Sequence, residues 1–101
     1  MGRTISGGNM ISRPQLVKAD GRFVYLHENY IIGRSSSCHM KLDDHLASRQ
    51  HAQLYTVQDF WHIKDMGSAS GTFVNGQSID IARLNPGDTI TIGTTHLIFR
   101  A

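Results

Sequence analysis

Residues 61–76, which read WHIKDMGSASGTFVNG, hold two short β-like runs at Trp61–Asp65 and Thr72–Val74. A turn rich in glycine and serine separates the runs, and the second run ends at Asn75-Gly76. This dipeptide is typical of a two-residue β-hairpin, because both central residues of a type I′ turn have a positive φ. The stretch therefore predicts a strand, a loop, a second strand and a hairpin turn.

The same alternation of short runs and turns continues on both sides of this stretch. Asp20-Gly21 is a second hairpin dipeptide, Pro86-Gly87-Asp88 marks a further turn, and residues 89–92 alternate with both isoleucines on one face. No segment has apolar residues at helical spacing over three turns, so the pattern predicts an antiparallel sandwich or barrel. The eight further runs are Gln15–Lys18, Arg22–Leu26, Tyr30–Gly33, Met40–Leu42, His51–Val57, Gln77–Ile79, Thr89–Ile92 and His96–Arg100, and we expect Phe60, Trp61 and Phe73 in the core.

Composition limits the classes to which this protein can belong. The 101 residues are 40% hydrophobic and 18% charged, which predicts one folded domain and argues against disorder. The net charge is +2 and the basic residues are scattered singly, so we expect no nucleic-acid partner. We also expect no membrane association, because no apolar run is long enough for a span and no secretory signal pattern is visible. The single cysteine, Cys38, favours a reducing compartment, so we expect a cytoplasmic protein, or a nuclear one in a eukaryote.

Three polar loop segments are candidates for a binding site. They are residues 33–37 (Gly-Arg-Ser-Ser-Ser), 48–51 (Ser-Arg-Gln-His) and 67–72 (Gly-Ser-Ala-Ser-Gly-Thr). Arginine supplies charge and paired donors, serine a compact hydroxyl, and glycine lets backbone N–H groups approach an anion closely. Together these residue types favour a site for an oxyanion, phosphate above all. For any one segment alone, the simpler explanation is that small polar residues only form turns.

Taken in order, these segments resemble the forkhead-associated (FHA) domain, a phosphothreonine-binding β-sandwich. The resemblance rests on Gly33-Arg34, Asp44, Ser48-Arg49-Gln50-His51-Ala52, residues 61–76, and a closing series of Leu84, Pro86-Gly87-Asp88, Ile90, Ile92-Gly93 and Phe99. It implies an all-β antiparallel sandwich of about 10–11 short strands with the binding loops at one end. It also implies a flexible tail over residues 1–13, an FHA domain over 14–101, and recognition of phosphothreonine segments of partner proteins in Ser/Thr kinase signalling.

The resemblance also implies a role for individual residues. Arg34 and Ser48 would contact the phosphate with help from Arg49, whereas His51 would brace the loops from within and Gly71 would let its loop turn sharply. Ser70 stands where the family usually has an asparagine that hydrogen-bonds the peptide backbone, and this departure puts the anchoring of the peptide chain in question. In full, the predicted phosphopeptide-binding residues are Arg34, Ser48, Arg49, Ser70, Ser35 and Ala69, and the predicted supporting residues are Gly33, His51, Gly71 and Asn75.

Enzyme and metal-site alternatives fit the sequence poorly. Ser48 and His51 would point to opposite faces of a strand, and Ala69 occupies the centre of Gly67–Gly71 where a nucleophile elbow needs serine. The six histidines show no His-x-x-x-His or His-Glu-x-x-His spacing, and one cysteine gives no thiolate pair. We therefore expect a binding module without catalytic activity, metal or cofactor, and a monomer in isolation.

Two further hypotheses concern how such a module would work. The main alternative to phosphothreonine recognition is an FHA-like interaction module that is independent of phosphorylation and uses a sheet face. Separately, a phosphorylated Thr4 in the N-terminal tail could fold back onto the binding loops of its own chain, because the intervening residues span up to roughly 30 Å when extended.

Overall fold

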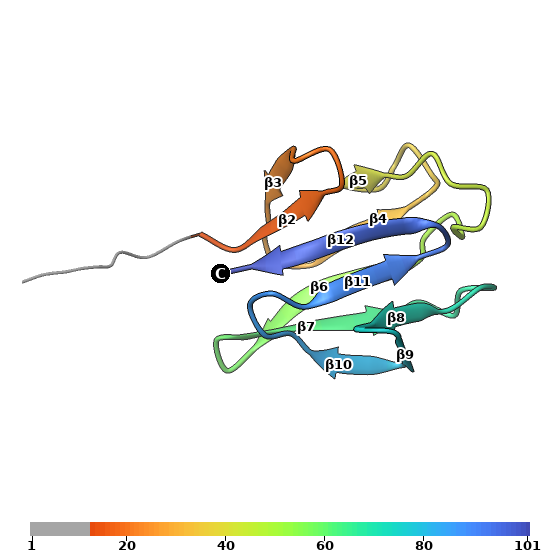
Figure 1. Ribbon diagram of the computed structural model, residues 1–101. Coiled ribbons are helices and arrows are strands. Elements are labelled where there is room, and N and C mark those ends of the chain that lie inside the picture. The colour runs from red at the N-terminus through yellow and green to blue at the C-terminus, as the bar shows by residue number, and fades with distance from the viewer. Residues whose placement is uncertain (1–12) are drawn as a thin grey trace, which may run out of the picture.

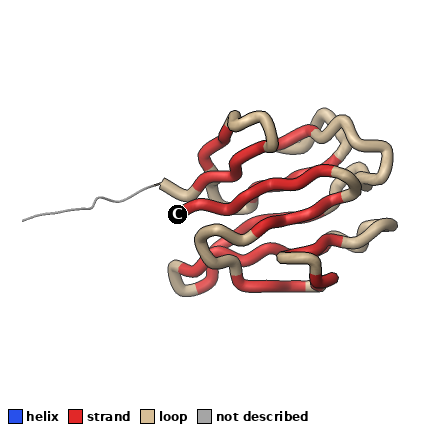
Figure 2. The backbone as a smooth tube through the Cα atoms, viewed as in Figure 1, coloured by secondary structure: helices blue, strands red, loops and turns tan. Residues whose placement is uncertain are grey.

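The computed structural model describes residues 13–101; Thr4 and nearly all of the predicted tail lie outside the described residues. The described part is built entirely of short strands and loops, as the tube in Figure 2 shows, which confirms the all-β prediction. It contains no helix that could cross a membrane. The strands are β2 (Gln15–Lys18), β3 (Phe23–Tyr25), β4 (Tyr30–Gly33), β5 (Met40–Lys41), β6 (Ala52–Val57), β7 (Phe60–Asp65), β8 (Thr72–Val74), β9 (Gln77–Ile79), β10 (Ile81–Arg83), β11 (Thr89–Ile92) and β12 (Thr95–Arg100).

The strands form two sheets that pack face to face as a sandwich (Figure 1). One sheet has the order β10-β7-β6-β4-β5 and the other the order β3-β2-β12-β11-β8-β9. Every neighbouring pair is antiparallel except β4 and β5, which run parallel with Ile32 beside Met40. This pair departs from the purely antiparallel prediction, because the loop after β4 carries the chain back alongside that strand before β5 begins.

The core lies between the sheets and follows the alternation of the strands. Ile90 and Ile92 are fully buried, which confirms that both isoleucines of β11 face inward. Phe60 is a correction: its side chain is 48% exposed on the outer face of β7, where the Arg83 guanidinium lies 3.8 Å from the ring centroid. Trp61, the next residue along β7, is only partly buried and packs against the core. Phe73 is a second correction, because it alternates with the buried Thr72 and Val74 and therefore lies on the outer face of β8. The fully buried apolar residues are Leu16, Ile32, Ala52, Leu54, Ile63, Ile90 and Ile92.

Turn geometry explains three of the connections between strands. Asn75 and Gly76 have φ values of 51° and 82°, which confirms the type I′ turn. At Asp20-Gly21 only the glycine has a positive φ, because Lys18 accepts from Gly21 N–H and a three-residue loop replaces the expected two-residue turn. Gln58 and Asp59 join β6 to β7 with φ values of 51° and 69°, a positive-φ pair without glycine that the sequence did not suggest.

One strand was missed from the sequence. The ten predicted runs match ten of the eleven strands to within one or two residues, but β10 follows β9 after only Asp80. No glycine or proline separates β9 from β10, so the chain lacked the usual sign that one strand ends and another begins. Strand β10 leaves the sheet of β9 and pairs with β7 of the other sheet instead.

The predicted binding loops gather at one end of the sandwich (Figure 1). Strands β4 and β7 end there and β6 and β8 begin there, as the pairings of Ile32 with Ala52 and of Ala52 with Asp65 require. The turn between β11 and β12 lies at the same end, because Ile92 pairs with Thr72 at the start of β8. The two sheets therefore hold residues 34–39, 42–51, 66–71 and 93–94 as one cluster of loops.

We expect Leu54→Ala to lower the free energy of unfolding by about 2–5 kcal/mol, because Leu54 is fully buried between the sheets and its loss leaves a cavity. Chemical denaturation of both proteins measures the difference. Val57→Ala removes apolar atoms from the same strand at a side chain that is 46% exposed, and it should change stability by less than about 0.5 kcal/mol. Equal losses for the two variants would contradict the assignment of faces on β6.

Candidate functional site

Backbone hydrogen bonds join the loop after β4 to the loop before β6. Arg34 N–H donates to Ser48 O at 2.9 Å, and Ser35 N–H donates to Arg49 O at 3.1 Å. Gly33 makes this approach possible, because a Cβ atom at that position would lie 2.2 Å from Arg49 O. The two predicted Arg-Ser segments are thus held side by side by their main chains.

The Arg34 side chain is exposed but anchored. Its Nε–H donates to Ala47 O at 3.0 Å, and within residues 13–101 its two Nη groups make no hydrogen bond or ion pair. The guanidinium lines a depression of about 370 Å³ together with Leu42, Asp43, Asp44 and His45. Arg34 therefore keeps two donor groups that no other described residue uses, at the edge of a depression that also carries two carboxylates.

Ser48 lies between two loops and uses only part of its hydrogen-bonding capacity within the protein. Its Oγ accepts from Ala69 N–H at 3.0 Å, which links the loop before β6 to the loop between β7 and β8. A hydroxyl has one proton to donate and two lone pairs, so this contact leaves the Ser48 proton available to an anion. Ser48 is half-buried, and its position is set by neighbours on both sides.

His51 is fully buried beneath these loops and connects them. Its Nδ1 accepts from Ser48 N–H at 2.9 Å, and its Nε2 lies 2.8 Å from Gly71 O. Because Nδ1 is an acceptor, the ring carries its proton on Nε2, which donates to the Gly71 carbonyl. Both ring nitrogens are therefore occupied within the protein, and His51 is a brace for the loops.

The loop between β7 and β8 is held by a carboxylate and two serines. Burial alone would raise the pKa of Asp65, but hydrogen bonds from Ser68 and Thr72 bring that pKa below its usual value. Ser68 Oγ also accepts from Gly71 N–H at 2.9 Å. Ser70 Oγ donates to Leu46 O at 2.7 Å, so its only proton is used to tie this loop to the neighbouring one.

Asp44 holds the loop before β6 against the turn between β11 and β12. Its carboxylate is buried and accepts from Leu46 N–H, from both the N–H and the hydroxyl of Thr94, and from the Thr95 hydroxyl. These hydrogen bonds lower the pKa of Asp44 to about 2, and the one from the Thr95 hydroxyl has the largest effect. A Cβ atom on Gly93 would lie 2.5 Å from the same carboxylate, so only glycine leaves room for it. The sequence showed Asp44 as part of a motif without indicating this role.

The structure brings together most, but not all, of the predicted site residues. Arg49 contributes its main-chain carbonyl to the loop contacts, while its exposed side chain makes no hydrogen bond or ion pair in the described part of the chain. Asn75 lies at the far end of β8 from Gly71, where it bonds to Asp88 and Thr89 and contacts none of the binding loops. The residues gathered in the loop cluster are Gly33, Arg34, Ser35, Ser48, His51, Ala69, Ser70 and Gly71.

Comparison with known proteins decides the family. The profile of the FHA domain matches residues 30–93, which covers the loop cluster and the strands around it. The chain belongs to the FHA domain family. A solved structure described as showing phosphothreonine-dependent FHA domain interactions is 30% identical, with a TM-score of 0.83 over 89% of this chain and 97% of that one.

Two curated relatives come from Mycobacterium tuberculosis. An ABC transporter ATP-binding/permease protein is 43% identical over 68 residues, which are 67% of this chain and 8% of the transporter. The glycogen accumulation regulator GarA is 35% identical over 81 residues, which are 80% of this chain and 50% of the regulator. This FHA domain therefore corresponds to half or less of the length of each of these relatives.

We expect His51→Ala to lower the free energy of unfolding by about 1–3 kcal/mol, because it leaves Ser48 N–H and Gly71 O without their buried partner. For a domain of this size the melting temperature should fall by several degrees. His96→Ala, at an exposed position on β12, should leave the melting temperature nearly unchanged. An unchanged melting curve for His51→Ala would contradict the role of His51 in holding the loops of the FHA site together.

We expect the contribution of Asp44 to the stability of the fold to be lost at acid pH. Its pKa in the folded protein is about 2, below the ordinary value of 3.8, so its contribution to stability is fully present above that ordinary value and is lost as the pH falls toward 2. The stability of the native sequence should therefore fall more steeply over this interval than that of Asp44→Asn, because the other carboxylates are common to both proteins. Thermal melts through this pH range measure the two slopes, and parallel slopes would contradict the role of Asp44.

Proposed function

We propose that this FHA domain binds a phosphothreonine segment of a partner protein and catalyses no reaction. One observation carries the proposal. Arg34 and Ser48 come from different loops, their positions are fixed by hydrogen bonds to neighbouring loops, and the donors that remain unused lie at the loop end of the sandwich. A phosphate monoester supplies the complementary acceptors, with three oxygens and a charge of about −1.5 to −2 near neutral pH.

The fixed geometry of these donors favours a phosphate over a carboxylate. An arginine anchored through Nε still offers its Nη groups to a tetrahedral anion, and a serine hydroxyl can add one donor to a third oxygen. The donors in this FHA domain are ordered before a ligand arrives, so binding costs little further side-chain ordering. The solved relative with phosphothreonine-dependent interactions supports the same assignment.

The absence of a reaction is supported by the hydrogen bonds of His51. Nucleophilic catalysis by Ser48 would need a base within hydrogen-bonding reach of its hydroxyl. His51, whose ring contacts the Ser48 main chain, uses Nδ1 for the backbone N–H of Ser48 and Nε2 for the Gly71 carbonyl, so neither nitrogen is available to the Ser48 hydroxyl. We assign the phosphorylating step to a separate Ser/Thr kinase in the cytoplasm and propose that the domain recognises the product as a monomer.

A second candidate is an interaction that does not require phosphorylation and uses the outer face of the five-stranded sheet. Val57, Phe60 and Ile81 are 46%, 48% and 56% exposed on that face, and Val57 pairs with Phe60 across the β6–β7 hairpin. Exposed apolar residues on one sheet face are typical of protein contacts. Binding that is equal for a phosphorylated peptide and its unphosphorylated form would favour this candidate.

We expect Arg34→Ala to weaken binding of a phosphothreonine peptide at least tenfold, since hydrogen bonds to a charged group are worth about 1.5–3 kcal/mol each. Calorimetric titration of a phosphothreonine peptide library hit, with its threonine form as a reference, measures the effect. Arg100→Ala removes the same charge at the opposite end of the sandwich and should retain native affinity. Equal affinities for Arg34→Ala and the native sequence would exclude Arg34 from the site.

A further inference from the structure

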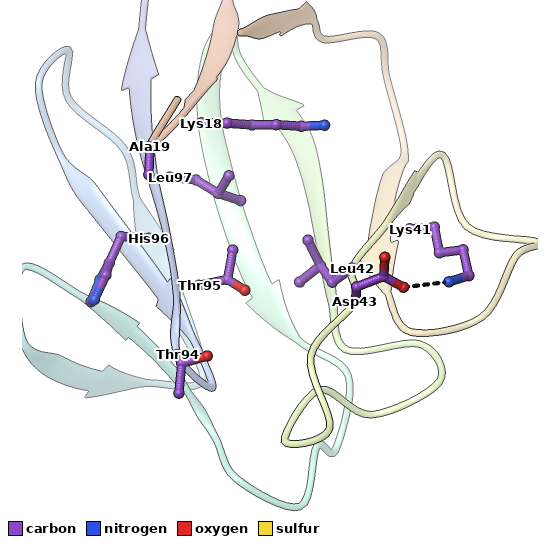
Figure 3. Close-up of a pocket in the computed structure, with 9 residues that line it drawn as sticks. All are labelled: Lys18, Ala19, Lys41, Leu42, Asp43, Thr94, Thr95, His96 and Leu97. Carbon is purple, nitrogen blue, oxygen red and sulfur yellow. Dashed lines mark hydrogen bonds and ion pairs between the residues drawn. The ribbon is translucent and has the colours of Figure 1, made fainter. Parts of the chain in front are cut away.

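A second hollow lies beside the proposed phosphate site, between β12 and the segment that follows β5. Its volume is about 410 Å³, and Figure 3 shows the side chains around it. Lys18 extends from β2 across the hollow toward the side where Lys41 and Asp43 lie, whereas His96 points to the opposite side of β12. The lining residues are Lys18, Ala19, Lys41, Leu42, Asp43, Thr94, Thr95, His96 and Leu97.

Lys18 occupies a position on the core-facing side of its sheet. It pairs with Leu97, and two residues earlier Leu16 pairs with Phe99; these three apolar neighbours are at most 1% exposed. Side chains at paired positions project from the same face, so Lys18 continues an inward-facing apolar row at the end of β2. A lysine here lays its stem along Leu97 and delivers its ammonium group into the hollow.

The ammonium group of Lys18 is the uncompensated charge of this hollow. Across residues 13–101 it has no carboxylate within 4.0 Å, whereas Lys41 Nζ lies 2.9 Å from Asp43 Oδ1. The hydroxyl protons of Thr94 and Thr95 are both donated to Asp44, so these threonines offer only lone pairs. Lys41 is compensated by Asp43, and the carboxylate of Asp44 behind the two threonines already accepts four hydrogen bonds. The ammonium group of Lys18 is therefore the charged donor of this hollow that remains free.

The hollow adjoins the depression beside Arg34. Leu42 and Asp43 line both this hollow and the depression that contains Arg34. Lys41 also pairs with Gly33 on the adjacent strand, one residue before Arg34. A peptide held by its phosphate at Arg34 can therefore place a neighbouring side chain in the hollow without leaving the loop end of the domain.

We propose that this hollow binds an acidic side chain, aspartate or glutamate, of the same phosphothreonine peptide, with Lys18 as the residue that selects it. This inference rests on the proposed function and specifies its substrate class. Charge complementarity selects the occupant: the hollow offers an unpaired ammonium group and an apolar floor of Leu42 and Leu97, which suit a carboxylate on a short aliphatic stem.

The test is a series of phosphothreonine peptides on an alanine background in which a single glutamate is moved through the four positions on each side of the phosphothreonine. The native sequence should bind one or two of these peptides about two- to fivefold more tightly than the same peptide with glutamine. Lys18→Met, which keeps the stem at its inward-facing position, should abolish this preference and leave the affinity for the glutamine peptide unchanged. Lys64→Met, on the outer face of β7, serves as the charge-matched control and should retain the preference.

The outcomes separate this inference from the proposed function. No preference for glutamate at any position, or a preference that survives Lys18→Met, overturns the role of the hollow while phosphate-dependent binding stands. Failure of the native sequence to distinguish any phosphothreonine peptide from its threonine form overturns both. Thermal melts of Lys18→Met and Lys64→Met should match that of the native sequence, which shows that a lost preference comes from the hollow and not from unfolding.

Discussion

The buried imidazole of His51 is the contact on which the binding end of the sandwich depends. One nitrogen accepts from the main chain of the Ser48 loop and the other donates to the main chain of the Gly71 loop. Because the side chain has no access to water, neither loop can move from the ring without leaving a buried polar group unpaired. The position of the Arg34 loop also depends on His51, because the backbone of that loop is hydrogen-bonded to Ser48 and Arg49.

The polar side chains around His51 fall into two groups. Some form hydrogen bonds only within the protein, and others keep donors that a ligand can use. Three side chains, those of Asp44, Asp65 and Ser70, hydrogen-bond to residues of their own or neighbouring loops. These contacts stabilise the loops, and we assign none of the three to ligand binding. The side chains of Arg34 and Ser48 each make one hydrogen bond within the described residues and retain donors. The division explains how a surface built mainly from turns can present a fixed pair of donors without a helix terminus or a metal ion.

The sequence was most informative where a local rule determines structure. Alternation in β11 and the Asn75-Gly76 turn depend on neighbours within a few residues, and both were predicted correctly. The parallel pairing of β4 with β5, the strand β10 and the exposure of Phe60 depend on which strand becomes a neighbour in space, and no local pattern encodes that.

The same distinction holds for the site. Motif order placed Arg34, Ser48 and His51 in one loop cluster, but it could not show that the Ser70 proton is donated to Leu46, because those residues are distant in the chain. Nor could it show that Asn75 lies away from the loops, or that Lys18 stands in an inward-facing row. That row becomes visible only once β2 is paired with β12.

The pairing of β2 with β12 has a mechanical consequence. Gln15, the first residue of β2, lies beside Arg100, the last residue of β12, so the ends of the two strands leave the sheet together at the end opposite the binding loops (Figure 1). Tension applied through these two ends acts across the ladder and loads its hydrogen bonds one after another, whereas a shear geometry would load them all at once. Under such tension we expect the β2–β12 pairs to separate from Gln15 toward Lys18, so that the end nearer the binding loops separates last.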